Sequence, residues 1–183
     1  MIVFSRGTHA LGGLAGRLLR FTPRLAGLRV EVDGDLEVQG LVWVPGPGRI
    51  RIGRGVRLVG RRAPIELRAH EGAEIVIEDG ALIEDGTSIE ATRSVRIGRG
   101  ARIGPFCKVI DNHFHHAVGD RLARPEPVPV SIGEGAVTGP RAMVLPGGEL
   151  GPGAWLGPGQ VLSLRLPAGM ELPRPQIAKK AAS

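Results

Sequence analysis

Residues 132–162 read IGEGAV TGPRAM VLPGGE LGPGAW LGPGQV L, and this stretch decides the fold. An aliphatic or β-branched residue returns at every sixth position, and the residue after it is usually glycine. The recurring positions are Ile132, Thr138, Val144, Leu150, Leu156 and Leu162. A period of six fits neither an amphipathic helix nor an alternating strand, and it is a signature of parallel β-helices. Each hexad is therefore predicted to form one short strand and one turn, with the recurring side chain stacked inward on its equivalent in the next coil.

The same spacing extends the prediction over most of the chain. It occurs in three earlier runs: Ile52 and Leu58; Ile77, Ile83, Ile89 and Val95; Ile97, Ile103 and Val109. The phase slips by two residues between Val95 and Ile97, which indicates an irregular coil. Residues 29–44 alternate apolar and polar side chains as strands do. We predict an all-β chain with a parallel β-helix domain at 30–168, an N-terminal cap segment at 1–29 and a basic C-terminal tail at 169–183.

The composition fits a single domain of this kind. The chain has 183 residues with 29 glycines and 15 prolines, yet 42% of it is hydrophobic, so it is not a disordered Gly/Pro polymer. The single cysteine, Cys107, excludes an intrachain disulfide framework and a multi-cysteine metal site, and core packing is its expected role. No apolar run is long enough for a membrane-spanning helix, and the N-terminus lacks a signal-peptide pattern. We therefore expect a cytoplasmic protein.

The net charge of +6 comes almost wholly from arginine. This charge suits an anionic partner, whether a nucleotide-bearing cofactor, a membrane surface or a nucleic acid, and an arginine-rich solvated surface explains it equally well. Residues 9–28 are predicted to form a short amphipathic helix with arginines nearby. This helix either caps the open end of the β-helix or lies as a basic segment on the inner face of an anionic membrane.

One long excursion, residues 111–131, interrupts the repeat with the sequence DNHFHHAVGDRLARPEPVPVS. Long loops on a rigid scaffold tend to carry function. This loop begins with Asp111 and Asn112 and then concentrates His113, His115 and His116. A neutral imidazole accepts a proton near physiological pH, so a histidine in this loop is a candidate general base.

The chain combines four features in order: hexads, an interrupting loop with Asp-Asn-x-Phe-His at 111–115, Pro-Val-x-Ile-Gly at 129–133, and further hexads. This pattern resembles the hexapeptide-repeat acyltransferases, and most of all the sugar O-acetyltransferases of polysaccharide and lipopolysaccharide pathways. The resemblance covers roughly residues 30–180. It implies a left-handed parallel β-helix with three hexads per coil and a homotrimer with acetyl-CoA in the groove between neighbours. It also implies direct acyl transfer to a sugar or glycan hydroxyl, with a loop histidine as the base.

The resemblance also implies roles for individual residues. His115 matches the histidine of the family motif and is expected to be the catalytic base, with His113 and His116 as the nearest alternatives and as substrate-binding candidates. Asp111 and Asn112 are expected to orient the imidazole or to bind the acceptor. The alternative interpretation is that they begin the loop by forming an Asx turn. The expected acetyl-CoA site uses Gly139, Trp155, Gly157, Arg174, Lys179 and Lys180. An exposed edge or a trimer contact is the other interpretation of Trp155, and a frayed basic tail is that of Arg174, Lys179 and Lys180. Trp155 lies one predicted coil after Val137, where relatives usually carry a tryptophan.

Two other interpretations stay open from the sequence. The β-helix could be a non-catalytic scaffold or binding module, because the segment 136–140 departs from the Val-Trp-Ile-Gly-Ala of relatives. A zinc site like that of γ-class carbonic anhydrases is the less favoured interpretation. His113, His115 and His116 are too close in sequence to be ligands from separate coils, and nothing in the spacing requires His70 as a further ligand. We therefore expect no metal. The expected partner is a sugar or glycan acceptor, and no nucleic-acid partner is expected.

Overall fold

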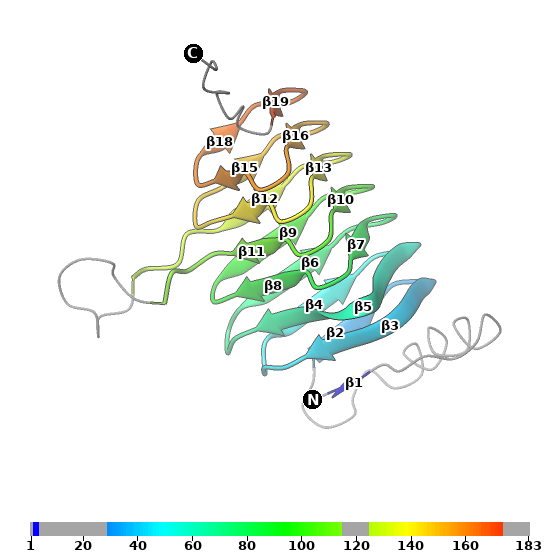
Figure 1. Ribbon diagram of the computed structural model, residues 1–183. Helices are drawn as coiled ribbons and strands as arrows, with labels where there is room; N and C mark the ends of the chain where they lie inside the picture. Colours follow the sequence, from blue (N-terminus) through cyan, green and yellow to red (C-terminus); the bar gives the residue numbers. More distant parts are fainter. Residues whose placement is uncertain (1, 4–28, 115–124, 174–183) are drawn as a thin grey trace, which may run out of the picture.

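The computed structural model describes residues 2–3, 29–114 and 125–173, and they form an all-β parallel solenoid (Figure 1). The predicted β-helix is thereby confirmed as a parallel solenoid, and the left hand implied by the resemblance stays a prediction. The predicted amphipathic helix at 9–28 and the tail from residue 174 lie outside the described residues. Among the described residues, no helix is long and apolar enough to cross a membrane.

The strands stack on three faces. Face 1 is a seven-stranded parallel sheet. Its strands are β2 (Arg29–Val32), β4 (Arg49–Ile52), β6 (Glu74–Ile77), β9 (Ser94–Ile97), β12 (Val130–Ile132), β15 (Glu149–Leu150) and β18 (Arg165–Leu166). Because parallel strands need a crossover, each coil must pass over two more faces before it returns to face 1.

Faces 2 and 3 belong to one sheet, because β3 (Leu36–Val44) and β5 (Val56–Ala69) are long enough to continue across the corner between them. Face 2 continues with β7 (Leu82–Glu84), β10 (Arg102–Ile103), β13 (Val137–Thr138), β16 (Trp155–Leu156) and β19 (Glu171–Leu172). Face 3 continues with β8 (Ser88–Ala91), β11 (Lys108–Ile110), β14 (Met143–Val144) and β17 (Val161–Leu162). The stacking on face 2 runs through Leu172.

The N-terminal strand β1 (Ile2–Val3) pairs antiparallel with β3 at Trp43 and Val44. It covers part of the strand edge that the first coil would otherwise present to other chains.

The core consists of the recurring residues, stacked as predicted. On face 2 the register places Ile83, Ile103, Thr138 and Leu156 directly over one another, and all four are buried. Burial of an aliphatic side chain of this size contributes about 1.5–3 kcal/mol. One column of this core therefore stabilises several consecutive coils.

The coils differ in length, and this difference explains the phase slip in the sequence. Between β12 and β15 the register advances by eighteen residues, from Ile132 to Leu150, as three hexads require. Between β6 and β9 it advances by twenty, from Ile77 to Ile97. The corner after Ala91 is longer than its later equivalents, so the slip noticed between Val95 and Ile97 originates a few residues earlier.

Candidate functional site

The loop leaves the solenoid after β11 and returns at β12, at the corner between faces 3 and 1 (Figure 1). The structure describes both of its ends, residues 111–114 and 125–131. His115 and His116, the predicted base and one of its alternatives, lie outside the described residues, as do Arg174, Lys179 and Lys180. His113 is described and is exposed.

Asp111 fixes the start of the loop to the preceding coil. Its side chain is completely buried. One carboxylate oxygen accepts hydrogen bonds from the Thr92 amide at 2.8 Å and the Thr92 hydroxyl at 2.7 Å. The other accepts from the amides of Arg93 at 2.6 Å and Ser94 at 2.7 Å. These donors belong to the lengthened corner, so the carboxylate holds that corner and the loop together, and the role of Asp111 in acceptor binding stays a prediction.

Asn112 ties the two ends of the loop to each other. Its Nδ2 donates to the Pro125 carbonyl at 2.7 Å, and its Oδ1 accepts from the Phe114 amide two residues later. That second bond is an Asx turn, the other interpretation that the sequence allowed. The Val128 amide adds a bond to the Asp111 carbonyl at 2.8 Å. The base of the loop is therefore closed by side chains that the sequence marked as substrate-binding candidates.

A histidine–carboxylate pair lies beside the base of the loop. His70 Nε2 is 2.8 Å from Glu90 Oε1, and the imidazole is 5.8 Å from the ring of Phe114, centroid to centroid. Phe114 directly precedes His115 in the sequence and has a left-handed backbone, with φ of 63°. Sequence reasoning considered His70 only as a metal ligand and missed this pair. The signal is the strand register, because it pairs Ala69 with Ala91, and His70 and Glu90 are the immediate neighbours of that pair.

The described residues predicted to bind the cofactor lie elsewhere on the solenoid. Trp155 is half-buried on face 2 and pairs with Val137, one coil earlier, as the spacing predicts. Gly139 and Gly157 are buried at the corner that follows, between faces 2 and 3. A Cβ on Gly139 would lie 2.6 Å from the Pro158 nitrogen, so coil stacking itself requires glycine there. The structure brings these three residues together and places the whole of face 3 between them and the loop.

Cys107 and Thr138 form a small polar contact inside the core. The thiol is 3.3 Å from the Thr138 hydroxyl and donates to the Gly139 carbonyl at 3.2 Å. The Thr138 hydroxyl also accepts from the Gly104 amide at 3.2 Å, which explains how a threonine replaces an aliphatic residue in the stack. Burial raises the pKa of the Cys107 thiol. The predicted packing role of Cys107 is confirmed by its 2% exposure.

We expect Cys107 to be unreactive in the folded protein. Only the thiolate attacks disulfide reagents, and both the raised pKa and the burial oppose its formation and access. Modification by an aromatic disulfide reagent at pH 8 should be at least about tenfold slower in buffer than in denaturant. Because the pKa is raised on folding, this thiol favours the folded state below its unfolded pKa, and that contribution is lost as the pH rises above it. Rapid stoichiometric modification of the native protein would contradict the burial.

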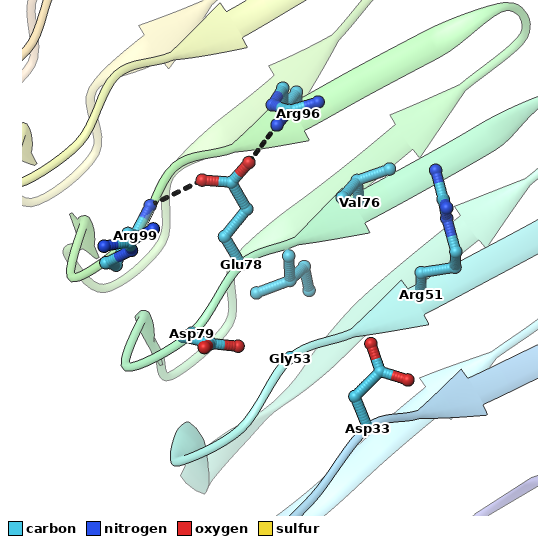
Figure 2. Close-up of a pocket in the computed structure, with 9 residues that line it drawn as sticks. Asp33, Arg51, Gly53, Val76, Glu78, Asp79, Arg96 and Arg99 are labelled. Atoms are coloured by element: carbon cyan, nitrogen blue, oxygen red, sulfur yellow. Dashed lines mark hydrogen bonds and ion pairs between the residues drawn. The ribbon is translucent and has the colours of Figure 1, made fainter.

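A pocket of about 370 Å³ lies on face 1 and contains none of the predicted site residues (Figure 2). The register places Val76 between Arg51 and Arg96, so the pocket has an apolar floor between two guanidinium groups. Arg96 pairs with Glu78, and Arg51 pairs with Glu74 at 3.0 Å. Two of the three arginines that line the pocket are thus already neutralised within the protein.

Asp79, on the rim of the same pocket, is also bound within the protein. It accepts a hydrogen bond from the Arg54 amide at 2.8 Å, and this bond lowers the pKa of the carboxyl group.

Within residues 2–3, 29–114 and 125–173, no group of three His, Cys, Asp or Glu side chains is placed to hold a metal ion. No protein-family model and no curated protein matches this chain.

Proposed function

We propose that this protein is an acyl-CoA-dependent O-acyltransferase that transfers an acetyl group to a sugar hydroxyl of a glycan or cell-envelope intermediate. One observation carries the proposal: a regular hexad solenoid is interrupted by a loop with the Asp-Asn-His-Phe-His sequence, and the base of that loop is fixed to the scaffold. Asp111 holds the start of the loop to the preceding coil, and Asn112 ties that start to the returning end of the loop. A rigidly anchored loop suits a group that must meet a substrate with defined geometry.

The proposed chemistry is direct transfer. The acceptor hydroxyl must lose a proton as it attacks the thioester carbonyl, and the imidazole of His115 is the proposed acceptor of that proton. The tetrahedral oxyanion requires preorganised donors, which backbone amides supply in many acyl-transfer enzymes. The carbonyl then re-forms, and the CoA thiolate leaves and takes up a proton.

The separation of the two groups of residues supports a site shared between subunits. Trp155 and Gly139 lie on face 2 and at its end, whereas the loop begins at the far edge of face 3, after Ile110. The described residues of one copy do not bring them together, and in this proposal the loop of one copy meets face 2 of a neighbour in a homotrimer. In this proposal Arg174, Lys179 and Lys180 bind the CoA phosphates.

A specific observation favours a second candidate, the non-catalytic scaffold. Both carboxylate oxygens of Asp111 and both polar atoms of Asn112 are used within the fold. The described base of the loop is therefore held by the fold itself, whether or not the loop also carries catalysis. The two candidates differ in whether the protein binds a CoA thioester.

We expect acetyl-CoA to raise the melting temperature and acetate to leave it unchanged. A ligand present at 100 times its Kd stabilises the folded state by about 2.7 kcal/mol, which corresponds to a shift of about 5–10 °C for a chain of this size. The measurement is a thermal melt with acetyl-CoA, CoA or acetate at increasing concentrations. No shift with acetyl-CoA at millimolar concentration would favour the scaffold and contradict the enzyme. A subsequent screen of acyl-CoA donors against glycan acceptors identifies the substrate.

A further inference from the structure

The corners of the solenoid depend on residues with a left-handed backbone, and two of these residues are not glycine. At the corner between faces 1 and 2, every such residue is glycine: Gly55, Gly80, Gly100, Gly135, Gly153 and Gly169. At the corner between faces 2 and 3, Gly86 and Gly159 follow the same rule, but Phe106 and Arg141 both have φ of 59°. A side chain in this conformation costs stability that glycine avoids. Phe106 and Arg141 occupy equivalent positions in consecutive coils. The Phe106 amide donates to the Asp85 carbonyl of the preceding coil, and the Arg141 amide donates in the same way to the Pro105 carbonyl.

Both side chains stay exposed in this conformation. Phe106 is 50% exposed, and Arg141 is exposed as well. The ring of Phe106 lies against Gly86, where an added Cβ would be only 2.5 Å from its Cδ1. The chain thus places an aromatic ring in solvent, at a strained position, beside a glycine that makes room for it. Strained residues of this kind cluster at functional surfaces.

Positive charge gathers around this ring. Arg62 belongs to the same corner, because its amide donates to the Asp85 carboxylate at 2.6 Å. Arg102 on face 2 and Lys108 on face 3 flank Phe106. We call the set that shares this edge the basic corner: Arg61, Arg62, Arg102, Phe106, Lys108 and Arg141. All six side chains are exposed.

The cations of the basic corner differ from most of the other arginines. On face 1 and the corner that follows, Arg51, Arg54 and Arg96 pair with Glu74, Asp79 and Glu78. In the part of the chain that the structure describes, no carboxylate forms an ion pair with any cation of the basic corner. Their charge is available to an external anionic partner.

We propose that the basic corner docks this protein on an anionic lipid membrane. In a single copy, an outer edge of a prism is convex, so it does not by itself enclose a small molecule, whose sites are concave. The acetyl-CoA site proposed at Gly139 and Gly157, which lie at this same corner, requires a neighbouring copy. The edge does present a ring and several cations to a soft, extended surface, where an aromatic side chain enters the headgroup region and lysine and arginine attract anionic lipids. Single-stranded nucleic acid is the weaker fit, because it requires a series of stacking aromatics and Phe106 is the sole aromatic residue of this set.

The test is sedimentation of the full-length protein with lipid vesicles. We expect binding to vesicles of mixed phosphatidylcholine and phosphatidylglycerol, little binding to phosphatidylcholine alone, and weakening by salt. Phe106→Gly should weaken the partition coefficient about tenfold, because the membrane no longer buries the ring. The melting temperature of this variant should be unchanged or higher, because the strain at the corner is relieved. A purely structural role for Phe106 predicts the opposite, a lower melting temperature.

The chain offers a matched control for charge. Arg141 and Arg99 are both exposed arginines without an ion pair among the described residues, and they lie at different corners. Arg141→Gln should weaken vesicle binding about fivefold, and Arg99→Gln should leave it nearly unchanged.

The proposal is wrong if anionic vesicles are not bound or if the two variants weaken binding equally. It is also wrong if the corner binds single-stranded RNA in place of vesicles, or if Phe106→Gly changes the oligomeric state. These outcomes do not depend on acyltransferase activity.

Discussion

Replacement of Asp111 by alanine is expected to lower the free energy of unfolding by about 3 kcal/mol. The substitution removes a buried carboxylate that accepts four hydrogen bonds, from the amides of Thr92, Arg93 and Ser94 and from the Thr92 hydroxyl. Each buried donor left without a partner costs about 1–3 kcal/mol, and water that enters the vacated space offsets part of that cost. Urea unfolding followed by circular dichroism measures the difference.

Asp85 provides a control at another corner. Its carboxylate also accepts from backbone amides, those of Arg62 at 2.6 Å and Ala63 at 3.4 Å, but it is only half-buried. Asp85→Ala should therefore cost about 1 kcal/mol, because water can satisfy the released amides. Equal losses in the two variants would mean that burial of Asp111 does not set its contribution. A near-zero loss for Asp111→Ala would show that the lengthened corner holds its shape without the carboxylate.

The fold was predictable from residues 132–162 because a stacked coil imposes the same demands every six residues. The inward position must be aliphatic or at least compact, and Leu150 and Leu156 meet this demand by packing on their equivalents in adjacent coils. The next position must lack a side chain where one coil passes close over another, as Gly139 does. These demands are local and periodic, so they are visible in one sequence.

The irregular coils were not predictable in the same way. Extra residues enter at corners, where no inward side chain marks the register. The corner from Thr92 to Ser94 is the example. The carboxylate of Asp111, which belongs to the next coil, accepts hydrogen bonds from the amides of this corner, so nothing within its own coil explains the extra length. The strain at Phe106 is hidden for a similar reason, since a phenylalanine gives no sign in the sequence that its backbone is left-handed.

The loop of the candidate site was predictable in its location and less so in its contacts. The break in the repeat placed the loop correctly between β11 and β12. The polar residues at its start were expected to orient the imidazole, to bind the acceptor or to open the loop as an Asx turn. Asp111 bonds to the preceding coil, Asn112 joins the two loop ends and forms the Asx turn, and their roles toward a substrate stay predictions. The His70–Glu90 pair depends on the register between two coils, which the hexad pattern does not specify at this irregular turn.

His115→Ala is expected to lower the rate of acyl transfer by about 10²–10⁴-fold, the usual contribution of a general base. The loss should fall on kcat, whereas the melting-temperature shift with acetyl-CoA and the oligomeric state should stay close to those of the unmodified protein. The base of the loop is anchored through Asp111 and Asn112, and His115 lies outside the hexads of the sequence, so the substitution removes the imidazole without removing the anchor. Steady-state kinetics and thermal melts on the same preparations separate these effects.

The pH dependence and the neighbouring histidines complete the test. In the unmodified protein, kcat should rise with pH as an imidazole loses its proton, near pH ~6.5 for an unperturbed group, and His115→Ala should lose this rise. His113→Ala and His116→Ala are the matched controls and should lower kcat less. If His115→Ala keeps full activity while one of the controls loses it, the base is that neighbouring histidine. If all three variants keep full activity and the pH profile is flat, a loop imidazole does not accept the proton, and the proposed mechanism is wrong.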